Sequence, residues 1–147
     1  MFEPSTAYVC IDLPAEQRQE AFRAVDNWNL SLNQWKKFVA VDNRDRPGAC
    51  TYSVTEVFEH KIDDEHAMAW ASRIGGSEIM MFKGHYEHDT AGILLHELGH
   101  VLGAQHVYGT LMNPTWSRYR FDCPDESTVA QVAAWNRVDL ETLSWCY

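Results

Sequence analysis

The chain carries three histidines, one glutamate and one glycine at a fixed spacing in the stretch His96-Glu97-Leu98-Gly99-His100-Val101-Leu102-Gly103-Ala104-Gln105-His106. Two histidines four residues apart lie on one face of a helix, so the imidazoles of His96 and His100 can reach the same ion. Gly103 follows one turn later, where a helix can end in a left-handed residue without steric cost. The chain can then turn and return His106 as a third ligand. The spacing predicts a helix with a metal site at its end.

Glu97 follows the first histidine directly, which places its carboxylate beside the ion rather than on it. Zinc held by three protein nitrogens keeps a fourth position for water, which is the catalytic form of such a site. The alternative is a zinc ion bound only for structure. Structural sites usually have four protein ligands and are often rich in cysteine, whereas no cysteine lies near this motif. The pattern therefore favours one catalytic zinc ion (Zn2+).

The composition is that of one globular domain over residues 1–147, with 46% hydrophobic and 12% aromatic residues. No apolar run approaches the eighteen or so residues that cross a membrane, so no membrane partner is expected. The formal net charge is −9 and the basic residues do not cluster, which argues against nucleic acid. Charge thus favours a protein or peptide partner, and we expect a monomer.

The cysteines Cys10, Cys50, Cys123 and Cys146 are far apart and form no C-x-x-C pair. In an extracellular protein they would form one or two disulfides in one of three pairings, and in a cytosolic protein they would be buried thiols. The start of the sequence lacks the basic and apolar regions of a secretory signal. The protein is then expected either to stay where it is made or to be the mature form of an extracellular protein.

Hydrophobic periodicity and turn residues predict an α+β fold with about five strands. The expected strands are residues 7–11, 38–41, 51–58, 66–72 and 78–82. Asp12 and Pro14 open a first helix that runs to about residue 32, and Trp28 lies on its core face. The motif helix is capped by Asp89 or Thr90. A final helix runs from Ser127 to about residue 143, capped by Asp125 or Ser127.

The motif, with a methionine in the segment Thr110-Leu-Met-Asn-Pro114, resembles the metzincin clan of zinc peptidases and within it the matrixins. The resemblance covers most of the chain, although only the motif and the methionine segment are specific. It implies a single metzincin-like domain with a mixed, mostly parallel and twisted sheet of about five strands. It implies that Met112 forms a hydrophobic base beneath the zinc in a Met-turn. It also implies an edge strand that binds substrate, at Ala67, Met68, Ala69, Trp70 and Ala71.

The resemblance implies peptide-bond hydrolysis as the reaction. Zinc on the three histidines would lower the pKa of its water from about 15.7 towards 7 and polarise the scissile carbonyl. Glu97 would take the water proton and deliver it to the leaving nitrogen. Trp116 and Tyr119, shortly after the methionine segment, would wall the pocket for the side chain that follows the cleaved bond, with ordinary core aromatics as the alternative.

The sequence departs from the matrixin pattern at several places. Five residues separate His106 from Met112, which makes a short loop, and Met80 and Met81 stand where matrixins hold a second, structural zinc. The remaining histidines are expected to be solvated or in the core rather than ligands of a second ion, namely His60, His66, His85 and His88. The chain is therefore expected to be a minimal or divergent metzincin.

Two other functions fit parts of the pattern. A family of bacterial zinc endoribonucleases has a similar histidine spacing but lacks the glutamate after the first histidine, so Glu97 and the negative charge count against it. An inactive zinc-binding interaction module on a protease fold would keep the same ligands. The sequence leaves the substrate, the compartment and the means of latency open.

Overall fold

A computed structural model describes residues 5–45, 48–58, 69–71, 74–115 and 121–146. One sheet has the strand order β2-β1-β3-β5-β4. The strands are β1 (Ser5–Asp12), β2 (Lys36–Asp42), β3 (Tyr52–Val57), β4 (Ala69–Ala71) and β5 (Glu78–Phe82). β1, β2, β3 and β5 are mutually parallel, and β4 pairs antiparallel with β5 at one edge. The predicted mixed, mostly parallel sheet of five strands is confirmed.

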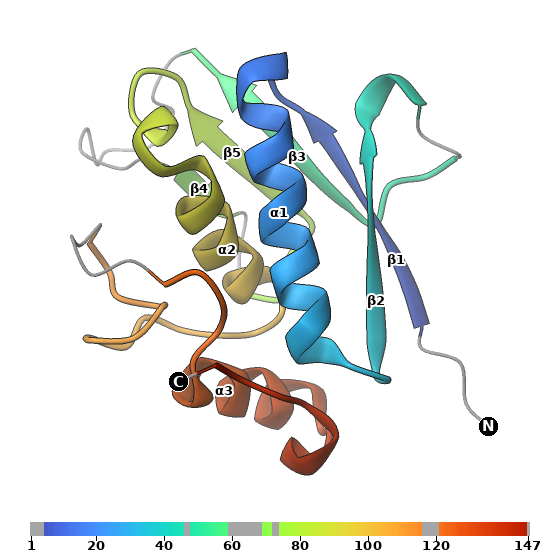
Figure 1. The fold of residues 1–147 in the computed structure, drawn as a ribbon, viewed down its shortest axis with the longest axis vertical. Helices are drawn as coiled ribbons and strands as arrows, with labels where there is room; N and C mark the ends of the chain where they lie inside the picture. Colours follow the sequence, from blue (N-terminus) through green and yellow to red (C-terminus); the bar gives the residue numbers. More distant parts are fainter. Residues whose placement is uncertain (1–4, 46–47, 59–68, 72–73, 116–120, 147) are drawn as a thin grey trace.

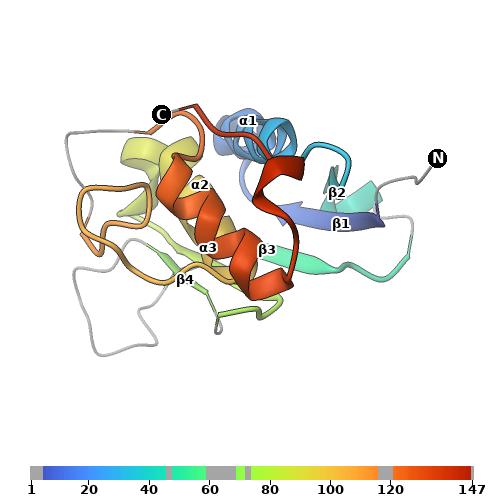
Figure 2. The same cartoon turned by 90° about the horizontal axis from the view of Figure 1, so that it is seen from below.

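Three α-helices accompany the sheet: α1 (Ala15–Leu32), α2 (Thr90–Val101) and α3 (Glu126–Asn136). Short 3-10 turns lie at Asn43–Asp45, Tyr86–Asp89 and Leu140–Thr142. α1 and α2 lie on the same face of the sheet, and α3 lies near the end of α2 (Figures 1 and 2). No helix in the described ranges is long and apolar enough to cross a membrane.

The helix α1 forms the crossover between the parallel strands β1 and β2. Its apolar residues recur every three or four positions, which gives one buried face. Fully buried Trp28 on this face donates a hydrogen bond from Nε1 to the carbonyl of Leu95 in α2 at 2.8 Å. Because a buried indole N–H needs an acceptor, this bond fixes α1 against the motif helix. The predicted helix and the core position of Trp28 are both confirmed.

The helix α2 begins where the sequence predicts, because the side chain of Asp89 accepts a hydrogen bond from the N–H of Gly92. Its core face is buried as expected, at Ile93, Leu94, Leu98, Val101 and Leu102. These residues pack with the inward side chains of the sheet into one apolar cluster. The motif helix is thus fixed along its length, which is what a metal site on its other face requires.

One predicted boundary is wrong. α3 ends at Asn136 rather than near residue 143, because Arg137 takes the left-handed conformation at φ 56° and Asp139 then caps a separate 3-10 turn. Of the strand predicted over 66–72, residues Ala69–Ala71 form β4, whereas 66–68 and 72 lie outside the described residues. The cap predicted at Asp125 is confirmed by its bond from the N–H of Thr128.

The cysteines are paired as Cys10–Cys50 and Cys123–Cys146. The first bond joins β1 to the segment before β3, and the second joins the residues before α3 to the end of the chain. The sequence left three pairings open. The fold selects this one because it brings the Cα atoms to 5.8 Å and 6.2 Å, within disulfide reach.

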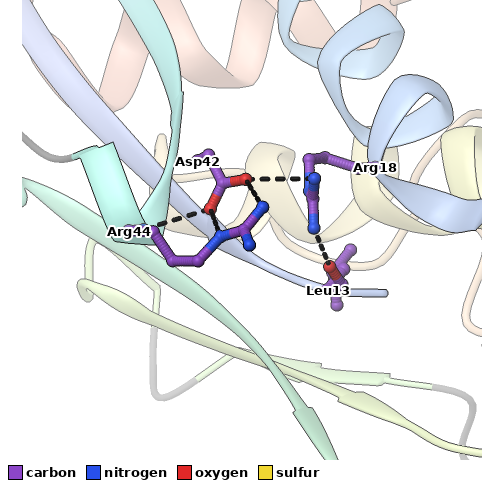
Figure 3. A network of polar contacts seen from close by, with 4 residues as sticks. All are labelled: Leu13, Arg18, Asp42 and Arg44. Atoms are coloured by element: carbon purple, nitrogen blue, oxygen red, sulfur yellow. Dashed lines mark hydrogen bonds and ion pairs between the residues drawn. The ribbon is translucent and has the colours of Figure 1, made fainter. Parts of the chain in front are cut away.

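A polar network joins the ends of β1 and β2 to α1 (Figure 3). Arg18 in α1 forms an ion pair with Asp42 at 3.0 Å and donates to the carbonyl of Leu13 at 3.3 Å. Arg44 also pairs with Asp42 at 3.0 Å. Hydrogen bonds from Arg44, with a smaller contribution from the charge of Arg18, hold the pKa of the Asp42 carboxyl at about 2. This network lies where β1 and β2 end, and it contains none of the motif histidines.

Candidate metal centre

The three histidines of the motif come together at the end of α2. One ligand atom from each of His96, His100 and His106 lies within 4.8 Å of the other two. Nε2 of His100 lies 3.1 Å from Nε2 of His106. His96 and His100 are half-buried, whereas His106 is exposed. Three imidazoles at this spacing form a group that can hold a metal ion.

Backbone carbonyls fix the orientation of two of these rings. Nδ1 of His96 donates to the carbonyl of Leu111 at 2.8 Å, and Nδ1 of His100 donates to the carbonyl of Ala104 at 2.8 Å. A proton on Nδ1 leaves the lone pair on Nε2, which is the tautomer a metal ligand needs. The arrangement therefore fits a cation bound through Nε2 of both rings.

The environment also favours neutral imidazoles. Burial, followed by the charge of the neighbouring His100, lowers the pKa of His96 to about 4. Burial likewise lowers the pKa of His100 and of His106. At neutral pH the rings are then unprotonated, and only the neutral imidazole binds a metal.

Glu97 is buried, with 7% of its surface exposed. Among the described residues, its Oε2 atom has no hydrogen-bond partner. Burial raises the pKa of Glu97 to about 8. A buried carboxyl oxygen without a partner is costly, and carboxyls with such strongly shifted pKa values are concentrated at functional sites. The structure therefore places a buried carboxyl directly after the first histidine of the cluster.

Gly103 has a positive φ of 112°, as the sequence predicts for the residue that ends the helix. Its N–H and that of Gly75 both donate to the carbonyl of His100 at 3.0 Å. A Cβ atom at Gly103 would lie 2.2 Å from Cγ of Trp135 in α3. Glycine is thus required here by backbone conformation and by the close approach of an aromatic ring.

Met112 is fully buried and lies against the motif helix between the first two histidines. A Cβ atom at Gly99 would be 2.6 Å from the Met112 sulfur. The turn that carries Met112 is closed by bonds from the N–H of Asn113 to the carbonyl of Thr110 at 3.0 Å and from Val107 to Met112 at 2.9 Å. The methionine therefore lies beneath the helix turn that bears the histidines.

The predicted substrate residues are described only in part. Ala69, Trp70 and Ala71 form the edge strand β4, and Ala69 and Ala71 are half-buried. β4 lies beside α2 and pairs with β5 on one side (Figure 1). Ala67, Met68, Trp116 and Tyr119 lie outside the described residues.

The sequence could not indicate the groups that orient the ligands. Leu111 and Ala104 contribute through their carbonyl oxygens, which every residue has, so no residue type marks them. Of the other histidines, His60 and His66 lie outside the described residues. Within the described ranges the candidate metal group contains the three motif histidines, without His85 or His88.

No family model matches the sequence, and a search of curated proteins finds no match. Among solved structures, the chain is similar to myroilysin, with 16% identity and a TM-score of 0.48 over 69% of this chain and 49% of that one. It is also similar to high choriolytic enzyme 1, a hatching-enzyme zinc-protease from the medaka fish Oryzias latipes. That match has 18% identity and a TM-score of 0.44, over 71% of this chain and 50% of the other. The chain thus spans about half the length of these two structures, and neither is named as a matrixin.

Proposed function

We propose that the protein is a zinc-dependent endopeptidase of the metzincin type, most similar to matrixins in its motif. The observation that carries the proposal is the buried Oε2 of Glu97, which has no partner among the described residues and belongs to the helix that bears two of three converging imidazoles. A structural site would need no such carboxyl, since burying it costs free energy without any return in packing.

His96, His100 and His106 would hold one zinc ion through imidazole nitrogens. Bound zinc would supply a Lewis acid that polarises a carbonyl and lowers the pKa of a water molecule. Glu97 would accept a proton from that water at its carboxylate and donate it to the leaving amine nitrogen. A carboxyl whose pKa lies near neutrality can do both, because neither protonation state is strongly preferred.

The edge of the sheet supports an extended peptide as the substrate. β4 lies at the end of the strand order next to α2, and its pairing among the described residues is with β5. An edge strand offers backbone N–H and C=O groups to an extended peptide. We assign Ala67 to Ala71 as the segment that would align the substrate, with Trp116 and Tyr119 as walls of the pocket beyond the scissile bond. Met112 would lie beneath the metal site, and Gly103 would form the turn that returns His106 to it.

The test uses an unstructured protein such as reduced, alkylated casein and compares wild type with Glu97→Gln. The matched control is Glu126→Gln, which changes an exposed glutamate in the first turn of α3. We expect both variants to bind one zinc ion per chain by mass spectrometry under native conditions. Cleavage should fall by at least about 100-fold in Glu97→Gln only, because the general base is lost. A chelator should abolish wild-type cleavage, and added zinc should restore it.

Four outcomes would contradict the proposal. Cleavage that persists in Glu97→Gln would exclude the assigned base. Zinc-loaded wild type that cleaves neither casein nor a random peptide library would favour the inactive interaction module. Cleavage of RNA but not of protein would favour the endoribonuclease. A reproducible content of two zinc ions would contradict the single-ion assignment.

A further inference from the structure

Side chains of α3 contact the backbone segment that leads from the motif helix to His106. The Asn136 amide donates to the carbonyl of Leu102 at 2.8 Å, at the start of this segment. The Trp135 ring covers Gly103 in the middle. The Gln131 side chain forms hydrogen bonds with the backbone of Gln105 at the end of the segment. One face of α3 thus follows the segment over its length.

The contact of Gln131 is made in both directions. The N–H of Gln105 donates to Oε1 of Gln131 at 2.9 Å, and Nε2 of Gln131 donates to the carbonyl of Gln105 at 3.1 Å. The side-chain amide therefore pairs with one residue's backbone as a neighbouring strand would. Two opposed bonds fix both the position and the rotation of that residue, which one bond could not do.

His106 depends on such contacts more than the other two histidines. His96 and His100 are held by the backbone of α2, whereas His106 lies outside any helix or strand and is exposed. The next residue, Val107, is fixed by its N–H bond to the carbonyl of Met112 at 2.9 Å. With Gln105 held by Gln131, both neighbours of His106 are fixed, and so is the direction in which its ring leaves the chain.

We propose that Gln131 is a positioning residue for the metal centre, which holds His106 in place as the third ligand by fixing the backbone of Gln105. The inference rests on the proposed function only in so far as the three histidines bind zinc. It does not require the protein to cleave peptides. Gln131 acts through the backbone and touches neither metal nor substrate.

The geometry also separates this role from a general contribution to stability. Gln131 is half-buried and its bonds to Gln105 are exposed to water, so each contributes little to the free energy of unfolding. The packing of α3 depends instead on its apolar side chains: Val132 is buried in the main core, and Val129 and Ala133 are buried with Leu143. Removal of Gln131 should therefore affect His106 more than it affects the fold.

The test measures zinc affinity by competition with a chromophoric chelator at fixed pH, and the melting temperature of the metal-free protein. The variants are Gln131→Ala, Gln131→Glu and His106→Ala. The matched control is Val129→Ala, which opens a cavity on the opposite face of the same helix. His106→Ala establishes that the measured affinity belongs to the histidine centre.

We expect Gln131→Ala to weaken zinc binding about 10-fold, as is typical when a residue that orients a ligand is lost. Its metal-free melting temperature should fall less than that of Val129→Ala, which should bind zinc with wild-type affinity. Gln131→Glu keeps the acceptor for the Gln105 N–H but loses the donor to its carbonyl, so it should give an intermediate affinity. With Co2+ as the probe, the d–d absorption spectrum should change in Gln131→Ala and not in Val129→Ala.

Affinity within twofold of wild type in Gln131→Ala would overturn the inference, as would an equal loss in Val129→Ala. Unchanged affinity in Gln131→Ala, combined with loss of cleavage in Glu97→Gln, would overturn this inference alone. Weakened zinc binding in Gln131→Ala, together with no peptide cleavage by wild type, would uphold it while the proposed peptidase function fails. Absence of zinc binding that depends on His106 would overturn both.

Discussion

The carbonyl of Leu111 accepts a hydrogen bond from Nδ1 of His96 at 2.8 Å, although the two residues are fifteen positions apart in the chain. The N–H of the same Leu111 donates to Oδ1 of Asp125 at 3.0 Å, and Asp125 caps α3. Leu111 thus connects the start of α3 to the first histidine of the motif. The residue that caps α3, a helix outside the motif, is therefore linked through Leu111 to a histidine of the candidate metal centre.

Replacement of Asp125 by alanine should destabilise the protein by about 2–3 kcal/mol, since it removes a helix cap and a buried acceptor. The carboxylate accepts from the N–H of Leu111 and from the N–H and hydroxyl of Thr128. Urea unfolding of the metal-free protein would measure the change. Asp125→Asn keeps one acceptor oxygen and should lose less. A cost below about 0.5 kcal/mol for Asp125→Ala would show that water replaces these bonds.

Replacement of Gly103 by alanine should destabilise the protein by more than about 2 kcal/mol, because a φ of 112° strains any residue with a Cβ and the new atom meets Trp135. The double variant Gly103→Ala with Trp135→Ala removes the contact but keeps the backbone strain. The double variant should therefore still be less stable than Trp135→Ala, but by a smaller margin than Gly103→Ala is less stable than wild type. Equal stability of the double variant and Trp135→Ala would mean that the ring, rather than the backbone conformation, makes glycine necessary. Thermal unfolding of the four proteins would decide the point.

The pH dependence of the metal-free protein should reveal the buried carboxyl. The pKa of Glu97 is raised from its usual 4.5 to about 8, so the folded protein keeps a proton that the unfolded chain releases. The stabilising contribution of the protonated group is fully present below pH 4.5 and is lost as pH rises through 8. Glu97→Gln cannot ionise, so its free energy of unfolding should rise relative to wild type over this range.

The shifted histidines are common to wild type and Glu97→Gln, so their contribution to the pH dependence cancels in the difference. Chemical unfolding of both proteins at about pH 5 and about pH 8.5, in the presence of a chelator, measures that difference. A difference that stays constant with pH would contradict the raised pKa. Asp42→Asn is a useful contrast, because the lowered pKa of Asp42 affects stability only as pH falls below 3.8 towards 2.

The two disulfides should differ in their effect on stability. Cys10–Cys50 closes a loop of sequence separation 40, and Cys123–Cys146 one of separation 23. Loop-closure entropy in the unfolded chain predicts a loss of about 3.9 kcal/mol for the paired alanine variant of the first and about 3.4 kcal/mol for that of the second. Buried Cys10 adds a packing loss in the same direction. Urea unfolding without reductant tests the order, and a larger loss for the second pair would contradict it.

Most of the elements could be predicted because their signals are local. The stripe of apolar residues up to Trp28 and Leu32 defines α1, and Asp89 marks the start of α2, since periodicity and capping depend on a few neighbouring residues. The end of α3 could not be predicted in this way. Val138 and Leu140 continue an apolar pattern, but they pack against Val129 and its neighbours after a turn at Arg137. Only the tertiary contact explains why the chain turns there.

The sequence by itself determined the set of chemical groups. His96 and His100 are spaced by the period of one helix, Glu97 follows the first of them, and His106 comes after the turn at Gly103. The tertiary structure decided what the sequence left open. It paired Cys10 with Cys50, buried the Glu97 carboxyl, and brought the Leu111 carbonyl to His96 and the Gln131 amide to Gln105. These contacts join residues far apart in the chain, and backbone groups supply much of their chemistry. Because almost every residue has a backbone carbonyl and N–H, the residue type does not predict a contact made through them, and only the fold shows it.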